Sequence, residues 1–441
     1  MEYLPNISFA IVLVAGIAFF RRNVLRLIRN IRLGREPQLE KNNAQRWKNM
    51  ARIALGQSKM VVRPVSGIMH ILVYVGFVII NIEVLEIIID GLLGTHRIFA
   101  GLGAVYDFLI ASFEILALLV IIAVVVFWLR RNIIRVKRFI KPEMKGWPKR
   151  DADLILYIEL VLMFLFLTMN ATDAQLQALN VEGYAQAGAF PISQFMMPWF
   201  DGMETASIIM IERAAWWLHI VGILVFLNYL YYSKHLHILL AFPNTFYGNL
   251  KPKGQFANLE AVTKEVQLMM DPNADPFAAP AEDAEPPEKF GASDVMDLKW
   301  TQLLGAYSCT ECGRCTSECP ANQTGKKLSP RKIMMDTRDR LEEVGRNMDA
   351  NSGKFVDDGK QLLDDYISRE ELWACTSCNA CVEACPVSID PLSIIMDMRQ
   401  YLVMEQSAAP TELNVMMSNV ENNGAPWPFN QMDRLNWVDE S

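Results

Sequence analysis

The 441-residue sequence has no cysteine outside residues 309–385, unlike a disulfide-rich secreted protein. It also lacks a Gly-x-Gly-x-x-Gly segment and a phosphate-binding loop, so nothing predicts a self-contained NAD, flavin or nucleotide enzyme. Cys-x-x-Cys-His is missing as well, which excludes covalently attached haem c. The polar, acidic second half carries no basic stretch interleaved with aromatic residues, so nucleic acid is not an expected partner.

Charged side chains are scarce in five stretches of the first 245 residues, although they make up 21% of the whole chain. A helix needs about 20 mostly apolar residues to cross a bilayer. We therefore predict an all-α membrane bundle of five transmembrane helices. Their apolar segments are residues 7–20 (lengthened by residues 4–6), 65–89, 105–129, a fourth that begins with 154–168, and a fifth within 208–240.

The loops between these segments differ sharply in charge. Residues 21–63 contain twelve Lys and Arg and residues 130–150 contain nine, whereas the opposite loops, 91–104 and 171–205, contain only Arg97. Because basic loops stay in the cytoplasm, we predict a multi-pass protein of a bacterial inner membrane, surrounded by lipid. Its N-terminus would lie outside, and everything after the fifth helix would be cytoplasmic.

The eight cysteines form two copies of Cys-x-x-Cys-x-x-Cys-x-x-x-Cys-Pro. This spacing is typical of chains that hold two [4Fe–4S] clusters, in which the fourth cysteine of each run binds the other cluster. Paired zinc sites would have no use for the fourth cysteine and its proline. We predict that cluster one is bound by Cys309, Cys312, Cys315 and Cys385, and cluster two by Cys375, Cys378, Cys381 and Cys319.

Histidines within membrane segments are costly and usually functional, and a common function is axial ligation of haem iron. His70 lies about one and a half turns into the second helix, at 1.5 Å rise per residue. His235 and His237 lie near the cytoplasmic end of the apolar run 208–240. We predict that His70 and His237 match in depth and bind one haem b near the cytoplasmic face, with His235 as the alternative to His237.

His219 lies eighteen residues before His237, roughly 27 Å toward the outside at the same helical rise. It suits a second, outer haem b, for which His96 is the only remaining candidate partner. The alternative is that these histidines are hydrogen-bonded structural residues that bind no metal.

The five-helix pattern and the spacing of His219 and His237 resemble the cytochrome b subunit of respiratory nitrate reductase and the membrane subunit of heterodisulfide reductase. In the nitrate reductase family, two histidines ten residues apart on helix two pair with two on helix five. His70 matches the first of these, but the position ten residues on is Ile80, so the usual ligand of the outer haem is absent here. The resemblance implies haem b and quinone chemistry for residues 1–245.

Beyond the membrane half, composition divides the chain further. Residues 271–289 are acidic and rich in proline, which predicts an extended linker. Ser329-Pro330 and the capping box Ser368-x-x-Glu371 predict helix starts, and further helices are expected over 360–367 and from Pro391 to Met404. The predicted domains are 1–245 (bundle), 246–293 (linker), 294–405 (α-helical ferredoxin domain) and 406–441 (an extended, partner-binding tail without periodicity).

The segments 372–378 and 385–390 resemble the helical di-cluster ferredoxin domain of heterodisulfide reductase. Iron–sulfur subunits of glycerol-3-phosphate, glycolate and lactate oxidation systems share this domain. In those families Cys-Cys-Gly repeats usually follow it, and this chain has none. The resemblance therefore implies a separate Cys-Cys-Gly-type iron–sulfur subunit as a partner. The fusion of both halves resembles electron-transfer-flavoprotein:menaquinone oxidoreductases, which implies a flavoprotein dehydrogenase partner.

Together these features predict a membrane-anchored subunit of an oxidoreductase. It would pass electrons between a cytoplasmic partner and the quinone pool through two [4Fe–4S] clusters and haem b. One alternative is the reverse flow, from quinol to a cytoplasmic acceptor of the disulfide type. A second alternative is a haem-free anchor that docks a ferredoxin module in a larger complex.

Overall fold

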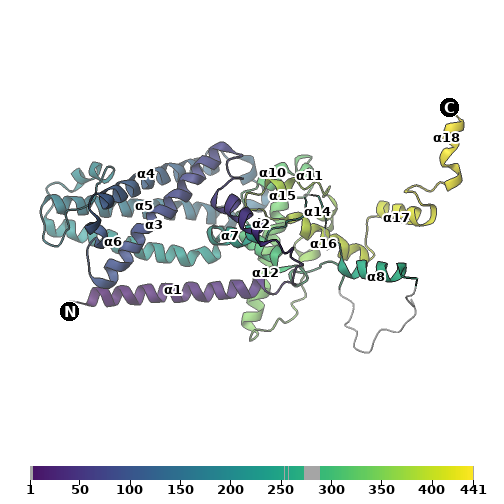
Figure 1. Ribbon diagram of the computed structural model, residues 1–441, viewed down its shortest axis with the longest axis horizontal. Helices are drawn as coiled ribbons and strands as arrows, with labels where there is room; N and C mark the ends of the chain where they lie inside the picture. The colour runs from purple at the N-terminus through teal and green to yellow at the C-terminus, as the bar shows by residue number, and fades with distance from the viewer. Residues whose placement is uncertain (1–2, 253, 257, 273–288, 441) are drawn as a thin grey trace.

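The structure is a computed structural model that describes residues 3–252, 254–256, 258–272 and 289–440. The described part is helical, and its only bridges of β type are two isolated ones. Five long helices lie side by side as a bundle, and a compact group of shorter helices packs against one end of it (Figure 1). The all-α prediction is confirmed.

Five of the described helices are long and apolar enough to cross a membrane, as predicted. The first four extend beyond the apolar runs that predicted them, because their ends continue into polar sequence. Their bounds are α1 (Leu4–Ile31), α3 (Pro64–Leu93), α4 (Ala104–Asn132), α5 (Trp147–Ala178) and α6 (Thr205–Tyr229, continued as a 3₁₀ turn to Tyr232).

The last spanning helix ends earlier than the apolar run 208–240 predicts. Ser233 adopts an extended backbone conformation (φ −116°, ψ 147°), which stops the helical turn. Its side chain also accepts a hydrogen bond of 3.0 Å from the backbone N–H of His235. The chain then turns into α7 (His237–Phe246), so the prediction that both histidines lie at the end of helix five is corrected: they belong to the bend and to α7.

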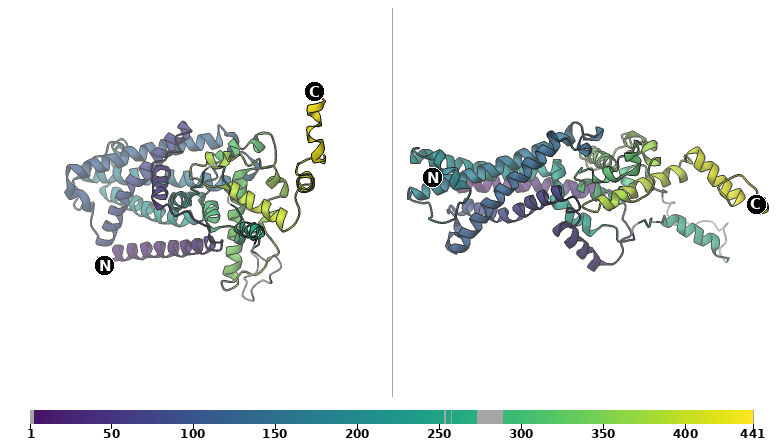
Figure 2. Two further views of the ribbon diagram at one scale, coloured as in Figure 1. Left: turned by 45° about the vertical axis from the view of Figure 1, so that its right-hand side comes forward. Right: turned by 90° about the horizontal axis from the view of Figure 1, so that it is seen from above.

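The two ends of the bundle have different surroundings. The N-terminus and the connections 94–103 and 179–204 lie at the end away from the cysteines, here called the far end. The connections 32–63 and 133–146 lie at the other end, here called the cluster-side end, beside the shorter helices (Figures 1 and 2). Within 32–63 the chain forms α2 (Asn43–Met50) and a π-helical turn.

The group of shorter helices holds all eight cysteines. Ser329 and Ser368 cap helices as predicted, the latter in a full capping box with Glu371. The expected helix over 360–367 is reduced to a distorted turn, because Asp364 has φ +71°. The helices are α9 (Trp300–Ser308), α10 (Arg314–Glu318), α11 (Pro320–Gln323), α12 (Pro330–Ala350), α13 (Leu362–Asp365), α14 (Arg369–Trp373), α15 (Ala380–Ala384) and α16 (Pro391–Met404).

The two halves share a hydrophobic core, in which Leu27 and Leu236 of the membrane half are buried in one cluster with Leu303 of the other half. Polar contacts reinforce this junction: the side chain of Asn30 at the end of α1 donates a 3.0 Å hydrogen bond to the hydroxyl of Tyr307. The cysteine-rich helices are therefore fixed to the bundle.

The linker and tail contain more helix than their composition suggested. The predicted linker contains α8 (Glu260–Met270), and most of its proline-rich run lies outside the described residues. The tail, expected to be extended, forms α17 (Thr411–Asn423) and two short helical turns, Gln431–Leu435 and α18 (Asn436–Asp439). This segment leaves the body of the molecule (Figure 2), and its apolar side chains are largely exposed.

Candidate functional site

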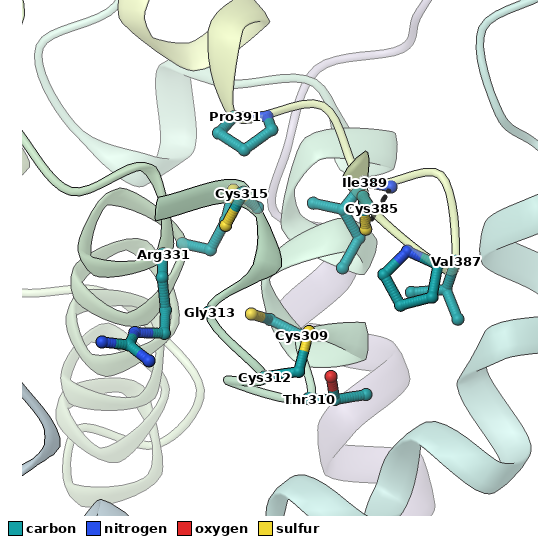
Figure 3. Close-up of a pocket in the computed structure, with 12 residues that line it drawn as sticks. Cys309, Thr310, Cys312, Gly313, Cys315, Arg331, Cys385, Val387, Ile389 and Pro391 are labelled. Carbon is teal, nitrogen blue, oxygen red and sulfur yellow. Dashed lines mark hydrogen bonds between the residues drawn. The ribbon is translucent and has the colours of Figure 1, made fainter. Parts of the chain in front are cut away.

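The four cysteines assigned to cluster one line a single pocket, although Cys385 is far from the others in sequence. Cys309, Cys312 and Cys315 come from the loop before α10 and from α10 itself. Cys385 approaches from the loop that leads to α16 (Figure 3). The described residues contain no group of His, Cys, Asp or Glu that would hold a single metal ion. Four thiols around one shared space fit the corners of a cubane cluster.

The backbone around the first cysteine run is shaped by two residues in left-handed conformations. Glu311 has φ +53° and Gly313 has φ +68°. A Cβ at Gly313 would collide with the guanidinium of Arg331, so glycine is required there both for its conformation and for its size. These turns let three cysteines within seven residues face one pocket.

Backbone N–H groups and burial both act on the thiols of this pocket. The N–H of Ile389 donates to the sulfur of Cys385 at 3.3 Å, a contact of the kind that tunes cluster thiolates. Burial raises the pKa of Cys309 to about 12 and the pKa of Cys385 to about 11. Such thiols release their protons when iron binds, because the metal supplies the positive charge that the surroundings lack.

The second set of cysteines lies closer to the surface. Cys378 is exposed and Cys375 is partly exposed, whereas Cys381 and Cys319 are buried. Burial raises the pKa of Cys319, and the neighbouring thiols of Cys375 and Cys378 raise it further. Cys319 therefore sits among the cysteines of the second run, and the donor set fits a second [4Fe–4S] cluster at the protein surface.

An arginine lies beside each cysteine set. The side chain of Arg331 is fully buried in the wall of the first pocket, and its guanidinium donates to the carbonyl oxygen of Arg138 at 2.7 Å. Arg399 donates to the carbonyl oxygen of Cys375 at 2.5 Å in the second set. Neither residue was singled out from the sequence. The sequence did hint that Arg331 is buried, because it directly follows Pro330 at the start of a helix whose apolar face is buried.

An ion-pair network joins the first cysteine loop to the membrane half. Glu311, between Cys309 and Cys312, pairs with Lys234 of the bend after α6 and with Arg338 of α12. Burial alone would raise the pKa of Glu311, but the two cations outweigh it and hold that pKa below its ordinary value. The cysteine loop is therefore held in place from both halves of the chain.

Two of the predicted haem ligands meet at the cluster-side end of the bundle. The ring centroids of His70 and His237 lie 6.3 Å apart. Two imidazoles that share one metal at about 2 Å from each ligating nitrogen would have similarly spaced centroids. The Nδ1 atom of His237 lies 3.0 Å from the carbonyl oxygen of Lys234, which leaves Nε2 available as a ligand. The Nδ1 atom of His70 is buried without a hydrogen-bond partner in the described structure.

His235 is the third histidine of this group, with its ring 5.4 Å from that of His237. Its Nε2 atom lies 3.6 Å from a carboxylate oxygen of Glu159, and its ring packs against Phe226. A carboxylate therefore lies near Nε2 of His235. The choice of His237 over His235 as the partner of His70 stays a prediction.

The predicted outer ligands are not brought together. His219 is buried on α6, where its Nδ1 atom lies 3.0 Å from the carbonyl oxygen of Leu162. His96 follows α3, and its Nε2 atom lies 3.4 Å from a carboxylate oxygen of Asp173. Among the described residues, the ring neighbour of His219 is Phe166 and that of His96 is Tyr184, so neither contacts a second histidine. A second haem remains a prediction.

Comparison with known proteins agrees with the cysteine geometry. The family model described as a 4Fe–4S dicluster domain matches residues 308–389. The chain is 29% identical over 98% of its length to a "Probable iron-sulfur-binding oxidoreductase FadF" of Bacillus subtilis, and covers 60% of that protein. It is 26% identical over 90% of its length to an "EtfAB:quinone oxidoreductase" of Syntrophomonas wolfei, and covers 54% of it.

A shorter match, 34% identical over 36% of this chain and 25% of the relative, is to a "Probable membrane-anchored ferredoxin" of Chromohalobacter salexigens. No solved structure matches. The chain spans little more than half the length of its two long relatives. With the five spanning helices, these matches identify a membrane-anchored iron–sulfur electron-transfer protein with two [4Fe–4S] clusters.

Proposed function

We propose that the chain passes electrons between a cytoplasmic redox partner and the membrane quinone pool, with haem b held by His70 and His237. The observation that carries this proposal is the contact of these two rings at the end of the bundle where the first cysteine pocket lies. When bound, the clusters and haem supply carriers that accept and release single electrons. The polypeptide would hold the first cluster near the two histidines and the second cluster nearer the surface.

Both histidines are linked to the first cysteine pocket through short contacts. His237 begins α7, and Asn244 of the same helix donates a 2.6 Å hydrogen bond to the carbonyl oxygen of Val387, which lines the pocket. Electron transfer between carriers needs such proximity, so this helix connects the two sites directly.

A second set of contacts links the first cysteine pocket to α3, the helix that carries His70. Arg314, next to Cys315, donates to the carbonyl oxygen of Met60 at 3.3 Å. That carbonyl packs on Gly67, less than one helical turn before His70, so closely that a Cβ would approach it to 2.7 Å. A larger residue at Gly67 would push this segment away from α3. The first cysteine pocket is thus attached to the helices of both proposed ligands.

The exposed position of Cys378 favours the second cysteine set as the place where a soluble partner exchanges electrons. The name of the Syntrophomonas relative supports a flavoprotein and a quinone as the two redox partners. A Cys-Cys-Gly-type iron–sulfur subunit is a further proposed partner, as the resemblance to heterodisulfide reductase implies. The basic loops support a cytoplasmic cluster domain and an outer N-terminus in a bacterial inner membrane.

The reverse flow is a second candidate, favoured by one observation. Over 27% of the chain, the sequence is 31% identical to one of the subunits of a "Ferredoxin/F(420)H(2)-dependent CoB-CoM heterodisulfide reductase" of Methanosarcina acetivorans. In that case quinol would be oxidised in the membrane, and two electrons and two protons would convert a cytoplasmic disulfide to two thiols. The site is compatible with both directions.

The test is reoxidation of the reduced protein by a quinone. Purified full-length protein in lipid vesicles is reduced with dithionite and mixed with a menaquinone analogue while haem and iron–sulfur absorbance are followed. Wild-type protein should reoxidise rapidly, whereas His237→Ala should reoxidise at least tenfold more slowly with its iron–sulfur absorbance intact. Equal rates in both proteins, or no reoxidation of the wild type, would refute the proposal and favour a haem-free anchor.

A further inference from the structure

A cavity of about 430 Å³ opens within the far end of the bundle, away from the cysteines. It lies between the start of α1, the end of α3, and the parts of α5 and α6 beside them. Phe9, Trp216 and Trp217 form an aromatic wall. Carboxylates, a histidine and arginines line the remainder, so the cavity combines flat apolar surfaces with a few polar groups, as small-molecule sites do.

Glu83 is a lining residue whose carboxylate is left incompletely hydrogen-bonded. Its side chain is only 3% exposed, and its Oε2 atom is buried without a hydrogen-bond partner in the described structure. The neighbouring Glu86 is satisfied, since it accepts hydrogen bonds of 2.9 Å from the hydroxyl of Tyr106 and the N–H of Phe99. A buried carboxylate oxygen with no donor is unfavourable. Glu83 thus offers an acceptor to a hydroxyl group in the cavity.

The other polar groups of the cavity are largely paired with one another. The buried guanidinium of Arg97 pairs with Asp173 and donates to Asn170 at 3.0 Å. Glu212 pairs with Arg213 in the same way. No group of His, Cys, Asp or Glu suited to a metal ion occurs among the described residues. Asp173 and Glu212 are each paired with an arginine and no metal-binding group lies among the described residues, so the cavity favours a neutral ligand over a metal cation.

We propose that this cavity binds the ring of a quinone or quinol; the inference rests on the quinone linkage proposed above. The indole and phenyl faces of Trp216 and Phe9 suit a flat aromatic ring. At one end of that ring a quinol hydroxyl donates to Glu83. His96 also lines the cavity; its Nε2 atom lies 3.4 Å from a carboxylate oxygen of Asp173, and its Nδ1 atom accepts a hydrogen bond from the N–H of Ala185. The isoprenoid tail leaves past α1, many of whose apolar side chains, such as Ile7, Ile11 and Val14, are exposed.

The reaction at this site balances as a two-electron, two-proton reduction. Each of the two C=O groups of the quinone becomes C–OH, with two electrons from the reduced cytoplasmic partner and two protons from water at the far end. Glu83 holds a hydrogen bond at one of the two oxygens where these protons arrive. His219, where the sequence predicts a second haem b, is three residues after Trp216 on α6. It therefore lies one helical turn from the cavity wall.

Binding of the quinone analogue 2-heptyl-4-hydroxyquinoline N-oxide to full-length protein, followed by quenching of its fluorescence, tests the site. Glu83→Gln keeps the shape of the side chain and removes its charge. We expect it to weaken binding at least tenfold, and His96→Gln, which alters the lining of the same cavity, to weaken it as well. The matched control is Glu159→Gln, which alters a carboxylate of the bundle at the cluster-side end, beside His235. The control should bind like the wild type.

The outcomes separate this inference from the proposal on which it rests. If the wild type does not bind the analogue, the quinone linkage itself fails. If Glu159→Gln weakens binding while Glu83→Gln and His96→Gln do not, the quinone linkage stands and the far-end site is refuted. Iron–sulfur absorbance and thermal stability of each variant identify misfolding. If Glu83→Gln misfolds, His96→Gln alone decides: undiminished binding in that variant overturns the inference.

Discussion

Arg331 and Glu143 form an ion pair of 2.7 Å across the junction between the cysteine-rich helices and the membrane half. Burial would raise the pKa of Glu143, but the hydrogen bond and charge of Arg331 hold it below its ordinary value. The same guanidinium forms part of the wall of the first cysteine pocket. One side chain therefore contributes to docking of the two halves and to the electrostatics of a redox centre.

Replacing Arg331 should alter the potential of cluster one. A reduced cluster carries one more negative charge, so a nearby cation favours the reduced form and raises the midpoint potential. Arg331→Gln should lower the midpoint of one of the two clusters by about 59 mV, a tenfold change for one electron. Redox titration followed by electron paramagnetic resonance measures both clusters in one sample.

The matched control is Arg399→Gln, because Arg399 contacts the second cysteine set. It should lower the midpoint of the other cluster and leave the first unchanged. Equal shifts of both clusters in both variants would show that the two arginines act through overall charge instead of through a local contact.

The crossed ligation predicts which cluster each fourth cysteine affects. Cys319→Ser should disturb the surface cluster, bound by the second run, because Cys319 lies among Cys375 and Cys378. Cys385→Ser should disturb the buried cluster instead. Spectra of the two variants should be complementary. If Cys319→Ser damages the cluster whose midpoint responds to Arg331→Gln, the crossed assignment is wrong.

Arg340 should be important for stability in a pH-dependent way. Its fully buried guanidinium pairs with Asp294 at 2.8 Å and with Asp358 at 2.6 Å. Removing one partner of a buried ion pair typically costs about 3–5 kcal/mol, so Arg340→Met should lower the thermal midpoint of the cysteine-rich half markedly. Circular dichroism or scanning fluorimetry measures the change.

The pH dependence follows from Asp358, whose pKa the hydrogen bond from Arg340 lowers. A carboxylate with a lowered pKa in the folded state stabilises it above the unfolded pKa of about 3.9, and this contribution is lost as pH falls through the folded value. The stability difference between wild type and Arg340→Met should therefore shrink below about pH 4. A difference that stays constant down to pH 2 would contradict this origin.

The sequence predicts features that depend on local pattern and misses those that depend on distant partners. The cysteine spacing, the five apolar runs and the capping box at Ser368 are local, and each appears in the structure. The break at Ser233 interrupts an apolar run, so hydropathy alone cannot locate it. The pairing of Arg331 with Glu143 joins residues 188 positions apart, and no local pattern reports such a contact.

The histidines illustrate the same limit. The adjacency of His70 and His237 follows from counting turns from each membrane surface, although His237 belongs to α7 and not to the spanning helix. By contrast, the proximity of Glu159 to His235 could not be predicted, because Glu159 belongs to another helix and lies beside His235 only in the folded chain.

Haem b content per chain is the measurement that tests the central claim most directly. Wild-type protein, His70→Ala, His237→Ala and the neighbouring control His235→Ala should be purified and assayed by pyridine haemochrome against iron–sulfur content. Comparing the haem content of His219→Ala with that of the wild type tests whether an outer haem is present. The account predicts haem b in the wild type and in His235→Ala, and loss of the cluster-side haem in His70→Ala and His237→Ala with both clusters retained. Wild-type protein without haem, or full haem content in both of those variants, would contradict it.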